Sequence, residues 1–409
     1  MWLYNLGISL YAGGIRLAAL WHGKARLWSE GRRNIFERME AAVRPSDRIV
    51  WVHAASLGEF EQARPIIERL RAEHPEYKIL LTFFSPSGYE IRKNYEGADY
   101  VFYLPADTPS NARRFLDIVH PEIAIFIKYE FWINLLSELR CRKVRSYIVS
   151  AIFRRNSVFF RPYGAMWRQA LETFDTLFVQ NVESKRLLSE IGFDNVVVAG
   201  DTRFDRVAQI AAAAQRVETI ERFRGGGRLF VAGSTWGPDE EILLPLVNAN
   251  PDVKFVIAPH EMDEGRIAHL MRDAKGGAVR YTQCDAATRF DDVQVLVLDT
   301  MGMLSSVYGS ATWAYVGGGF GVGIHNTLEA ATFGLPIAFG PNYGKFKEAR
   351  DMVSLGCAVS VRTAGELAAW FAPLRDDEET LRRASRTAKD YTARNQGATG
   401  IILRSIFNS

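Results

Sequence analysis

The chain has 409 residues, 48% of them hydrophobic and 24% charged. That length predicts two or three domains, each with a core of its own, and the composition excludes an intrinsically disordered protein. Lys and Arg number 50 against 47 Asp and Glu, and the net charge of +3 is too small to indicate a nucleic-acid-binding protein. Three scattered cysteines without C-x-x-C spacing and no H-E-x-x-H pair exclude a disulfide framework and argue against a bound metal.

The first 21 residues are largely apolar, with Arg16 as their only charged residue, and a basic stretch follows over residues 24–33. This length suits a membrane span, which needs ~20 apolar residues, with the basic flank on the cytoplasmic side. Arg16 weakens that interpretation, because a helix lying in the membrane interface accommodates such a charge more easily. A buried first helix of a domain is the third alternative. We expect residues 1–35 to be a membrane-associated helix with its basic flank.

From Ile49 onward, apolar strands alternate with amphipathic helices. We expect strands at 49–53, 78–83, 123–127, 144–150, 176–180 and 196–199, and helices at 59–73 and 87–95. This alternation predicts a parallel sheet with helices on both faces. We expect an N-terminal Rossmann-like domain over residues 36–205.

A second series of strands follows a polar, alanine-rich helix expected at 203–224 and the Gly225–Gly227 hinge. Its strands are expected at 229–232, 254–258, 295–299, 312–316 and 335–339. The chain would then consist of a linker at 206–228, a C-terminal Rossmann-like domain at 229–376 and a helical segment at 377–409 that could pack back on the first domain. The expected fold class is α/β, with two Rossmann-like domains facing across a cleft.

A glycine-rich turn follows the strand that ends at Val316. It holds five glycines in seven residues and ends at Asn326, where we expect a second helix to begin. Backbone N–H groups and the positive end of a helix suit a phosphate. Asn326 and Glu329 have the spacing of a capping box, so the ordinary alternative is a simple turn with a capped helix. Five glycines exceed the needs of one turn, and the pattern matches neither the dinucleotide fingerprint nor a P-loop, which favours a nucleotide that donates a group.

Nine motifs, spread over nearly the whole chain, carry a family resemblance. They are SLGEFEQARP at 56–65, FFSPSGYE at 83–90, YLPADTP at 103–109, KYEFWINLL at 128–136, VAGDTRFDRV at 198–207, GSTWGPDEE at 233–241, APHE at 258–261, DTMGML at 299–304 and GGGFGVGIHNTLEAATFGLPIAFGPNYGKFKEA at 317–349. In these motifs and their order, the chain resembles the bacterial 3-deoxy-D-manno-octulosonic acid (Kdo) transferases that act on lipid A.

The resemblance implies an inverting, metal-independent glycosyltransferase of the GT-B type. Its donor would be CMP-Kdo, and its acceptor a lipid A precursor, which is a phosphorylated and acylated disaccharide. It would need no cofactor and bind no nucleic acid. The expected role is lipopolysaccharide core biosynthesis at the cytoplasmic face of the bacterial inner membrane, with the N-terminal helix contacting membrane lipids.

The resemblance also assigns three catalytic positions. Glu59 matches the general base, and its carboxylate, with an ordinary pKa of ~4.3, would be ionised at neutral pH. Its alternative role is to close a capping box with Ser56. Glu130 and Arg203 match positions that stabilise the transition state, although many members carry lysine where Arg203 stands. The alternative for Glu130 and Arg203 is a plain salt bridge between them.

The CMP-binding positions of the family fall on three loops of the second half. They are Pro259, His260, Met301, Gly302, Met303, Asn326, Thr327, Leu328 and Glu329. The helix that begins at Asn326 would favour the phosphate by ~0.3–1 kcal/mol through its dipole, and Glu329 could accept hydrogen bonds from ribose hydroxyls. Taken singly, His260 reads as an ordinary buried histidine and the two methionines as core residues.

The acceptor surface is expected between Arg140 and Arg168, where eight basic residues alternate with aromatic ones. Such a surface suits phosphorylated headgroups beside acyl chains, whereas a solvated basic helix is its ordinary explanation.

Two other functions are compatible with the sequence. One is a GT-B enzyme that uses another activated sugar, such as a UDP-hexose. The other is a membrane-tethered nucleotide-sugar sensor, which would not need Glu59.

Overall fold

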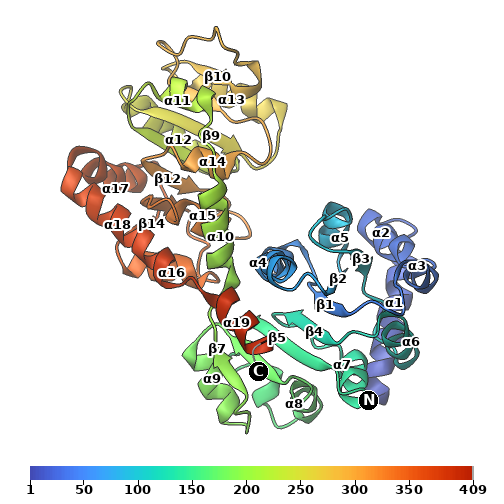
Figure 1. Cartoon of the computed structure of the whole chain (residues 1–409). Helices are drawn as coiled ribbons and strands as arrows, with labels where there is room; N and C mark the ends of the chain where they lie inside the picture. Colours follow the sequence, from blue (N-terminus) through green and yellow to red (C-terminus); the bar gives the residue numbers. More distant parts are fainter. Residues whose placement is uncertain (408–409) are drawn as a thin grey trace. The chain divides into compact units, whose positions relative to one another are not determined.

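Across residues 1–407, which the computed structural model describes, the chain forms two compact units, each built around a seven-stranded parallel sheet (Figure 1). The first unit contains Met1–Arg206 and the chain from Gln396 onward, and the second contains Val207–Asn395. The alternation of apolar strands and helices therefore produces the α/β architecture that it predicts.

The first sheet has the strand order β3-β2-β1-β4-β5-β6-β7. Its strands are β1 (Ile49–His53), β2 (Lys78–Phe83), β3 (Tyr100–Tyr103), β4 (Ile123–Ile127), β5 (Arg145–Ala151), β6 (Thr176–Val179) and β7 (Val196–Val198). Ile49 pairs with Lys78 on one side of β1, and Val50 pairs with Ile123 on the other. The order reverses between β1 and β4, so the loops after these strands diverge and leave room for a ligand.

Helices cover both faces of this sheet. They are α1 (Trp2–Ala18), α2 (Gly23–Gly31), α3 (Ile35–Ala42), α4 (Leu57–Glu73), α5 (Pro86–Arg92), α6 (Pro109–Val119), α7 (Ile133–Cys141), the 3₁₀ turn η1 (Val158–Phe160), α8 (Ala165–Leu171), α9 (Val182–Ser189) and α19 (Ala398–Phe407), with α10 (Thr202–Ala213) beginning after β7. Because successive strand side chains alternate in direction, Trp51 enters a core with α3, α6, α7 and α8, whereas Val50 and Val52 enter one with α4 and α19.

The second sheet has the strand order β10-β11-β9-β8-β12-β13-β14. Its strands are β8 (Leu229–Thr235), β9 (Lys254–Pro259), β10 (Ala278–Arg280), β11 (Val295–Val297), β12 (Trp313–Val316), β13 (Ile337–Phe339) and β14 (Ala358–Ser360). The order reverses between β8 and β12, and the glycine-rich turn follows β12. The turn therefore lies where an open α/β sheet binds its ligand.

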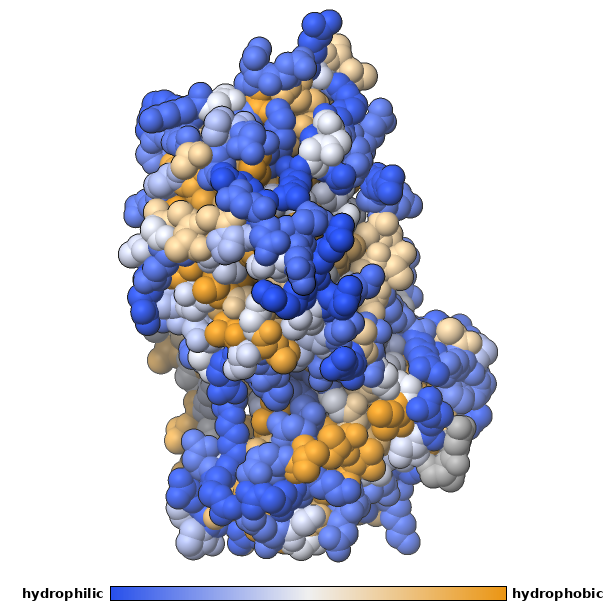
Figure 2. Space-filling view, turned by 90° about the vertical axis from the view of Figure 1, so that its left-hand side faces the viewer, coloured by the Kyte–Doolittle hydropathy of each residue, from blue (hydrophilic) through white to orange (hydrophobic). Residues whose placement is uncertain are grey.

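Two further cores flank the second sheet, because Leu229 and Phe230 point to opposite faces. The helices of this unit are α11 (Glu218–Arg224), α12 (Gly237–Ala249), α13 (Glu264–Asp273), the 3₁₀ turn η2 (Tyr281–Gln283), α14 (Leu304–Tyr308), α15 (Leu328–Ala331), α16 (Lys347–Ser354), α17 (Ala364–Asp376) and α18 (Glu378–Arg394). In the face that Figure 2 shows, hydrophilic residues predominate and apolar residues gather in separate groups between them.

Several expected elements differ from the observed ones. The helix expected at 203–224 is two helices, α10 and α11, separated by residues 214–217. The segment expected as one helix at 377–409 divides into α18, in the second unit, and α19, in the first. Asp205 holds the start of α19 by accepting hydrogen bonds from the backbone N–H groups of Gly397 (2.6 Å) and Thr399 (2.7 Å). The short strands β3, β10 and β14 were not expected.

The N-terminal apolar run is not one continuous helix. α1 ends at Ala18, and the chain turns before α2 begins at Gly23. None of the helices described within residues 1–407 has both the length and the apolar character needed to cross a bilayer. The Tyr4 hydroxyl donates to Asp107 (2.6 Å), which fastens α1 to the first unit. Trp2 and Leu3 are about three quarters exposed, so the alternative of a buried first helix is wrong.

Candidate functional site

The expected catalytic residues of the first unit all follow carboxyl ends of strands. Glu59 lies in the first turn of α4, after β1, and Glu130 lies in the loop after β4. Arg203 lies at the start of α10, after β7. Because β1 and β4 are neighbours at the point where the strand order reverses, Glu59 and Glu130 belong to the two loops that border the crevice of this sheet.

The capping box expected as the alternative role of Glu59 does not form. Ser56 is the N-cap residue of α4, but its side chain accepts no hydrogen bond from the backbone of that helix. Its hydroxyl instead donates to the Glu59 carboxylate. Glu59 is half-buried. Its carboxylate accepts a hydrogen bond from the Ser56 hydroxyl.

Two rings that were not among the expected site residues hold the carboxylate of Glu130. The indole N–H of Trp132 donates to Oε2 (2.8 Å), and Nε2 of His53 lies 3.2 Å from the same oxygen. His53 is fully buried, and its Nδ1 lies 2.9 Å from the hydroxyl of Thr82. Glu130, with 15% of its side chain exposed, therefore has a fixed position. The sequence feature that could have indicated His53 is its position at the end of an apolar strand, because side chains there reach a ligand crevice.

Arg203 forms a close ion pair with Asp201. The Nε–H of Arg203 donates to Asp201 (2.9 Å), and Nη2 lies 2.8 Å from the same carboxylate. Gln62 donates to the other oxygen of Asp201 (2.9 Å). Burial by itself raises the pKa of Asp201, but the charge and hydrogen bonds of Arg203 outweigh it and keep that pKa below its usual value. Asp201 thus orients the guanidinium, and it was not among the expected residues.

Replacing Asp201 with Asn is expected to lower the free energy of unfolding at pH 7 by about 1.5–3 kcal/mol, because hydrogen bonds to a charged group are lost. A carboxylate with a lowered folded-state pKa stabilises the fold fully above its unfolded pKa, about 3.9, and loses this contribution as pH falls through the folded value. Urea unfolding should therefore show a constant difference between wild type and variant above about pH 5 and a shrinking one below about pH 4. A difference undiminished at about pH 2 would contradict this role.

Tyr129, which is 48% exposed, is affected by several charged groups of the first unit. Burial is the main reason that its pKa is raised, and the charges of Arg154, Asp201, Arg203 and Glu59 also act on its phenol. Tyr129 follows Lys128, which has a positive φ of 61°. Non-glycine residues in this conformation are uncommon and occur often at functional sites.

The glycine-rich turn of the second unit owes part of its composition to close packing. An added Cβ at Gly317 would lie 2.2 Å from the carbonyl oxygen of Ser234, and one at Gly319 would lie 2.5 Å from the backbone of Gly340. These two glycines therefore let neighbouring backbones approach each other. Close packing of the backbone is therefore one reason for glycine at these two positions.

The helix after the turn is only one turn long. α15 covers Leu328–Ala331 and has Thr327 as its N-cap residue, so it does not begin at Asn326 as expected. A dipole built from so few peptide units gives a phosphate little stabilisation. The side chain of Asn326 accepts a hydrogen bond from the backbone N–H of Leu328 (3.1 Å). Because the side chain of Leu328 is fully buried, a ligand at the turn would meet the backbone of this residue.

The carboxylate of Glu329 is held by one residue of α14 and one residue of the turn before α15. The hydroxyl of Ser305 donates to one oxygen and the amide of Asn326 to the other, both at 3.0 Å. Thr327 is 1% exposed, and in the described part of the chain its hydroxyl has no hydrogen-bond partner. The Ser305 contact joins α14, which directly follows the loop at 301–303, to the turn at 326–329, one of the three segments expected to bind CMP.

The loop at 301–303 is a surface feature. Met301 is 79% exposed, so the alternative of a core methionine is wrong for it. Gly302 has a φ of 85°, and Met303 is half-buried. An exposed methionine at the carboxyl edge of the sheet offers an adaptable apolar surface.

His260 is exposed, so the alternative that it is an ordinary buried histidine is wrong. Its ring stacks on that of His325 with centroids 4.4 Å apart and lies 4.8 Å from that of Trp236. Burial and the nearby charge of His260 lower the pKa of His325. Pro259, which is buried at the end of β9, places His260 beside this stack. Trp236 and His325 were not expected, although they stand in the GSTWG and GIHN motifs.

The basic run from Arg140 to Arg168 is largely engaged within the protein. Arg140 pairs with Glu172 (2.7 Å), Arg155 pairs with Glu190 (3.1 Å), and Arg168 donates to the carbonyl of Phe159 (2.9 Å). Phe159 is 6% exposed and belongs to the core. Much of this run is therefore structural, which weakens the expectation that it forms an acceptor surface.

Comparison with known proteins shows a consistent similarity to one family of transferases. Residues 32–206 match the family model of 3-deoxy-D-manno-octulosonic-acid transferase (kdotransferase). The chain is 25% identical to the 3-deoxy-D-manno-octulosonic acid transferase of Haemophilus influenzae, over 88% of this chain and 86% of that protein. It is 28% identical to the protein of that name from Bordetella pertussis, over 87% of this chain and 86% of that protein. These matches indicate a glycosyltransferase. Residues 32–206 form a domain that matches the 3-deoxy-D-manno-octulosonic acid transferase family, and the chain is similar to such transferases over most of its length.

The fold is also similar to that of a solved structure. The UDP-GlcNAc 2-epimerase of Neisseria meningitidis, bound to UDP-GlcNAc, matches with a TM-score of 0.62 at 16% identity, over 88% of this chain and 100% of that chain. At this level of identity the likeness concerns the fold alone, which is two α/β units with parallel sheets.

Proposed function

We propose that this protein is an inverting, metal-independent GT-B glycosyltransferase that moves Kdo from CMP-Kdo to a lipid A precursor in lipopolysaccharide core biosynthesis. Similarity to the Kdo transferase family supports this donor and a lipid A-type acceptor. The sugar hydroxyl of the acceptor attacks the anomeric carbon of Kdo, and CMP leaves. The reaction therefore needs a base for the hydroxyl proton and positive charge for the departing phosphate.

The observation that carries the proposal is the arrangement of charged groups at the carboxyl edge of the first sheet. Glu59 offers a half-buried carboxylate held by the Ser56 hydroxyl, which suits a general base. Arg203, oriented by Asp201, supplies positive charge, and Glu130 is fixed by Trp132 and His53. Glu130 and Arg203 would stabilise the transition state. The phenol of Tyr129 interacts with the charges of both Glu59 and Arg203, which supports a common site.

We assign CMP to the carboxyl edge of the second sheet. Glu329 would accept hydrogen bonds from ribose hydroxyls, and His260 would contact the nucleotide through its exposed ring. The backbone at 326–328 and the loop at 301–303 would surround the phosphate and the base. Thr327 belongs to the segment 326–328, and Pro259, which precedes His260 at the end of β9, is the remaining proposed contact.

We also propose that the protein works at the cytoplasmic face of the bacterial inner membrane. Large apolar residues of α1 are exposed, among them Leu10 at 67% and Leu17 at 60%. A helix with such residues and a basic flank suits the interface between headgroups and acyl chains. Membrane lipids would then contact the protein through α1.

The test of the function is a donor-dependence assay. Purified protein is incubated with a lipid A precursor and CMP-Kdo, CMP-sialic acid or a UDP-hexose, and the products are analysed by mass spectrometry. We expect Kdo to be added to the acceptor from CMP-Kdo alone. Transfer from a UDP-hexose with none from CMP-Kdo would overturn the proposal and favour the rival glycosyltransferase. Tight CMP-Kdo binding without any transfer would favour the sensor.

Replacing Trp132 with Phe tests whether a fixed Glu130 matters. The change removes the indole N–H that donates to Glu130 but keeps an aromatic ring beside Phe84, whose centroid lies 4.5 Å from that of Trp132. Because one hydrogen bond to a charged group is lost, we expect kcat to fall about 10- to 100-fold. Steady-state kinetics with both substrates check this. An unchanged kcat would show that the Trp132 bond is not needed for turnover.

A further inference from the structure

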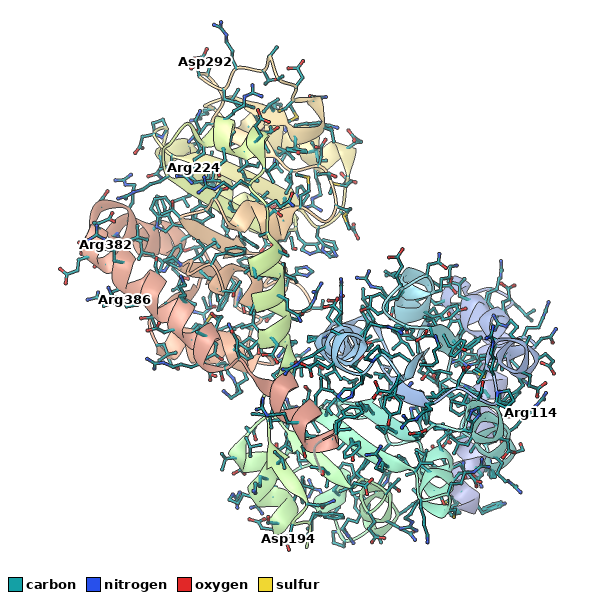
Figure 3. All side chains as sticks on the ribbon, viewed as in Figure 1. Arg114, Asp194, Arg224, Asp292, Arg382 and Arg386 are labelled. Carbon is teal, nitrogen blue, oxygen red and sulfur yellow. The ribbon has the colours of Figure 1, made fainter. Side chains whose placement is uncertain are left out.

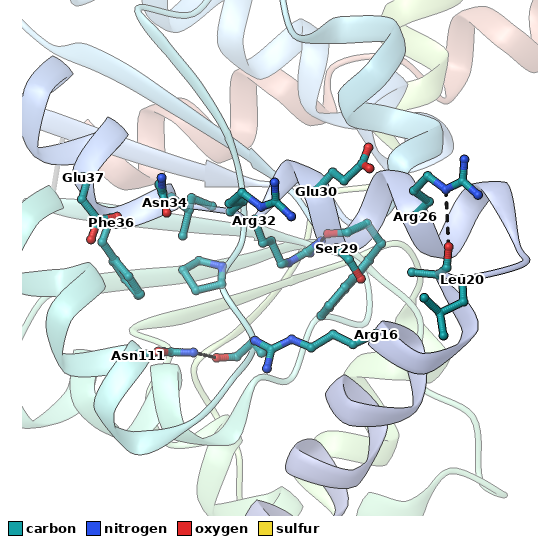
Figure 4. Close-up of a pocket in the computed structure, with 16 residues that line it drawn as sticks. Arg16, Leu20, Arg26, Ser29, Glu30, Arg32, Asn34, Phe36, Glu37 and Asn111 are labelled. Atoms are coloured by element: carbon teal, nitrogen blue, oxygen red, sulfur yellow. Dashed lines mark hydrogen bonds between the residues drawn. The ribbon is translucent and has the colours of Figure 1, made fainter.

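A cavity of about 740 Å³ lies in the first unit between α1, α2, α3 and the loop after β3 (Figure 4). Four arginines line it, against two glutamates: the arginines are Arg16, Arg26, Arg32 and Arg33, and the glutamates are Glu30 and Glu37. Glu37 is paired with Arg114 (3.3 Å), which lies outside the lining. The cavity therefore has a clear excess of positive charge and favours an anion.

Arg32 is a largely buried cation in the cavity wall. It donates three hydrogen bonds, to the carbonyl oxygens of Leu104 (2.8 Å), Trp28 (3.1 Å) and Phe84 (2.8 Å). Its guanidinium carbon lies 3.9 Å from the centre of the Trp28 ring. Burial lowers its pKa to about 9. Since neutral carbonyl groups and aromatic rings surround it, an anion in the cavity would supply the charge compensation that a buried cation needs.

Further donors of the wall are unused. Within residues 1–407, the indole N–H of Trp28 and the hydroxyl of Ser29 are buried without a hydrogen-bond partner. Arg16 and Arg33 make no side-chain hydrogen bond or ion pair in this part of the chain. Figure 4 shows the Arg16 side chain reaching from α1 toward Asn111. The guanidinium groups of Arg16 and Arg33 are therefore available to a ligand rich in hydrogen-bond acceptors.

The cavity is connected to the proposed catalytic site by packed rings. The centroid of Trp28 lies 6.0 Å from that of Phe84, and Phe84 lies 4.5 Å from Trp132. Trp132 in turn donates to Glu130 (2.8 Å). Only one intervening ring therefore separates the cavity wall from the residue that fixes Glu130.

Apolar surface borders the cavity on its α1 side. Leu20, which lines the cavity, is 70% exposed, and the neighbouring Trp21 is 70% exposed. A ligand that fits both features carries an anionic group for the arginines and acyl chains for the apolar residues. The volume of about 740 Å³ exceeds the needs of an inorganic phosphate and suits a sugar bearing one.

We propose that this cavity is a subsite for the acceptor and binds a phosphate group on the acylated sugar. Arg16 and Arg33 contact the phosphate, Arg32 supplies fixed positive charge, and the acyl chains lie along α1. The inference rests on the proposed function, since it names the part of the acceptor that this cavity recognises. It also places acceptor recognition at 16–37 and not in the basic run at 140–168.

The test compares two double variants that remove the same charge. Arg16→Gln/Arg33→Gln changes the cavity, and Arg383→Gln/Arg386→Gln changes exposed residues of α18 as the control, where Figure 3 labels Arg386. Each is assayed in detergent micelles with a phosphorylated lipid A precursor and with its dephosphorylated form. We expect the cavity variant to raise KM for the phosphorylated acceptor about tenfold or more. Its kcat, its KM for CMP-Kdo and its KM for the dephosphorylated acceptor should match those of wild type and control.

Several outcomes would overturn the proposal. One is an unchanged KM for the phosphorylated acceptor, and another is an equal rise for both acceptors. A third is weaker binding to anionic vesicles with unchanged KM in micelles, which would assign the arginines to bulk membrane lipid. Equilibrium binding of both acceptor forms to wild type and both variants needs no transfer. It therefore tests the cavity even if the wild type fails to use CMP-Kdo, and melting curves show whether each variant folds.

Discussion

Glu59→Gln is expected to lower kcat by about 10²- to 10⁴-fold, the contribution typical of a positioned general base. The amide keeps the size of the side chain but cannot take the proton of the attacking hydroxyl at neutral pH. The change also tests the ordinary role of the residue, because a helix cap would not affect turnover. In the structure Ser56 donates to Glu59 and makes no cap bond to the backbone, which removes the physical basis for that role.

The control for this variant is Glu68→Gln on the same helix. Glu68 forms an ion pair with Arg64 (2.6 Å) four residues away on the same helix, and pairs with this helical spacing contribute about 0.3–0.5 kcal/mol. We expect the control to keep wild-type kcat and both variants to bind CMP with the wild-type Kd in calorimetry. Undiminished turnover by Glu59→Gln would show that another group takes the proton. Loss of CMP binding would indicate a general defect of the fold.

The strands that position the site follow directly from the sequence. The predicted ranges 49–53, 78–83 and 123–127 agree with β1, β2 and β4, because each is an apolar run buried on both faces of a parallel sheet. Ligand loops after these strands then follow from the general behaviour of open α/β sheets. The strands missed were short: β10 has three residues and lies at an edge of its sheet. A run of that length gives no periodic signal.

The partners of the site residues could not be predicted in the same way. Glu130 is held by His53, which lies 77 positions away in the chain, and Asp201 is held by Gln62, 139 positions away. Such pairs depend on strand order and register, which local patterns do not specify. The single-turn length of α15 could not be predicted either. The spacing of Asn326 and Glu329 matches the sequence pattern of a capping box whether or not a long helix follows.

The N-terminal run shows how a correct pattern can support several structures. A largely apolar composition over 21 residues is compatible with a spanning helix, an interfacial helix and a buried helix, although Arg16 disfavours the spanning helix. The contact that decides part of the question, Tyr4 with Asp107, joins residues 103 positions apart. It attaches α1 to the first unit and leaves Leu10 and Leu17 exposed. Composition therefore predicts that α1 has an apolar surface. The contact of Tyr4 with Asp107 determines which side of the helix is exposed.

Arg203→Ala is expected to lower kcat by about 10²- to 10³-fold, because one preorganised positive group facing the charge of the transition state is removed. The guanidinium is already oriented by Asp201, so little reorganisation is needed when charge develops on the leaving phosphate. The same change leaves the buried Asp201 without its cation, which also destabilises the fold. Steady-state kinetics must therefore be accompanied by urea unfolding of the same preparation.

Arg203→Lys separates these two effects. Lysine keeps the charge beside Asp201 but loses the planar fork that binds an oxyanion with two parallel bonds. Because lysine keeps the positive charge, we expect the Lys variant to recover most of the stability and much of the kcat lost in Arg203→Ala. If the Lys variant restores stability while kcat remains as low as in the Ala variant, the guanidinium geometry and not its charge is needed. If both variants retain wild-type kcat, Arg203 only anchors Asp201, and the charge that stabilises the leaving phosphate must come from elsewhere.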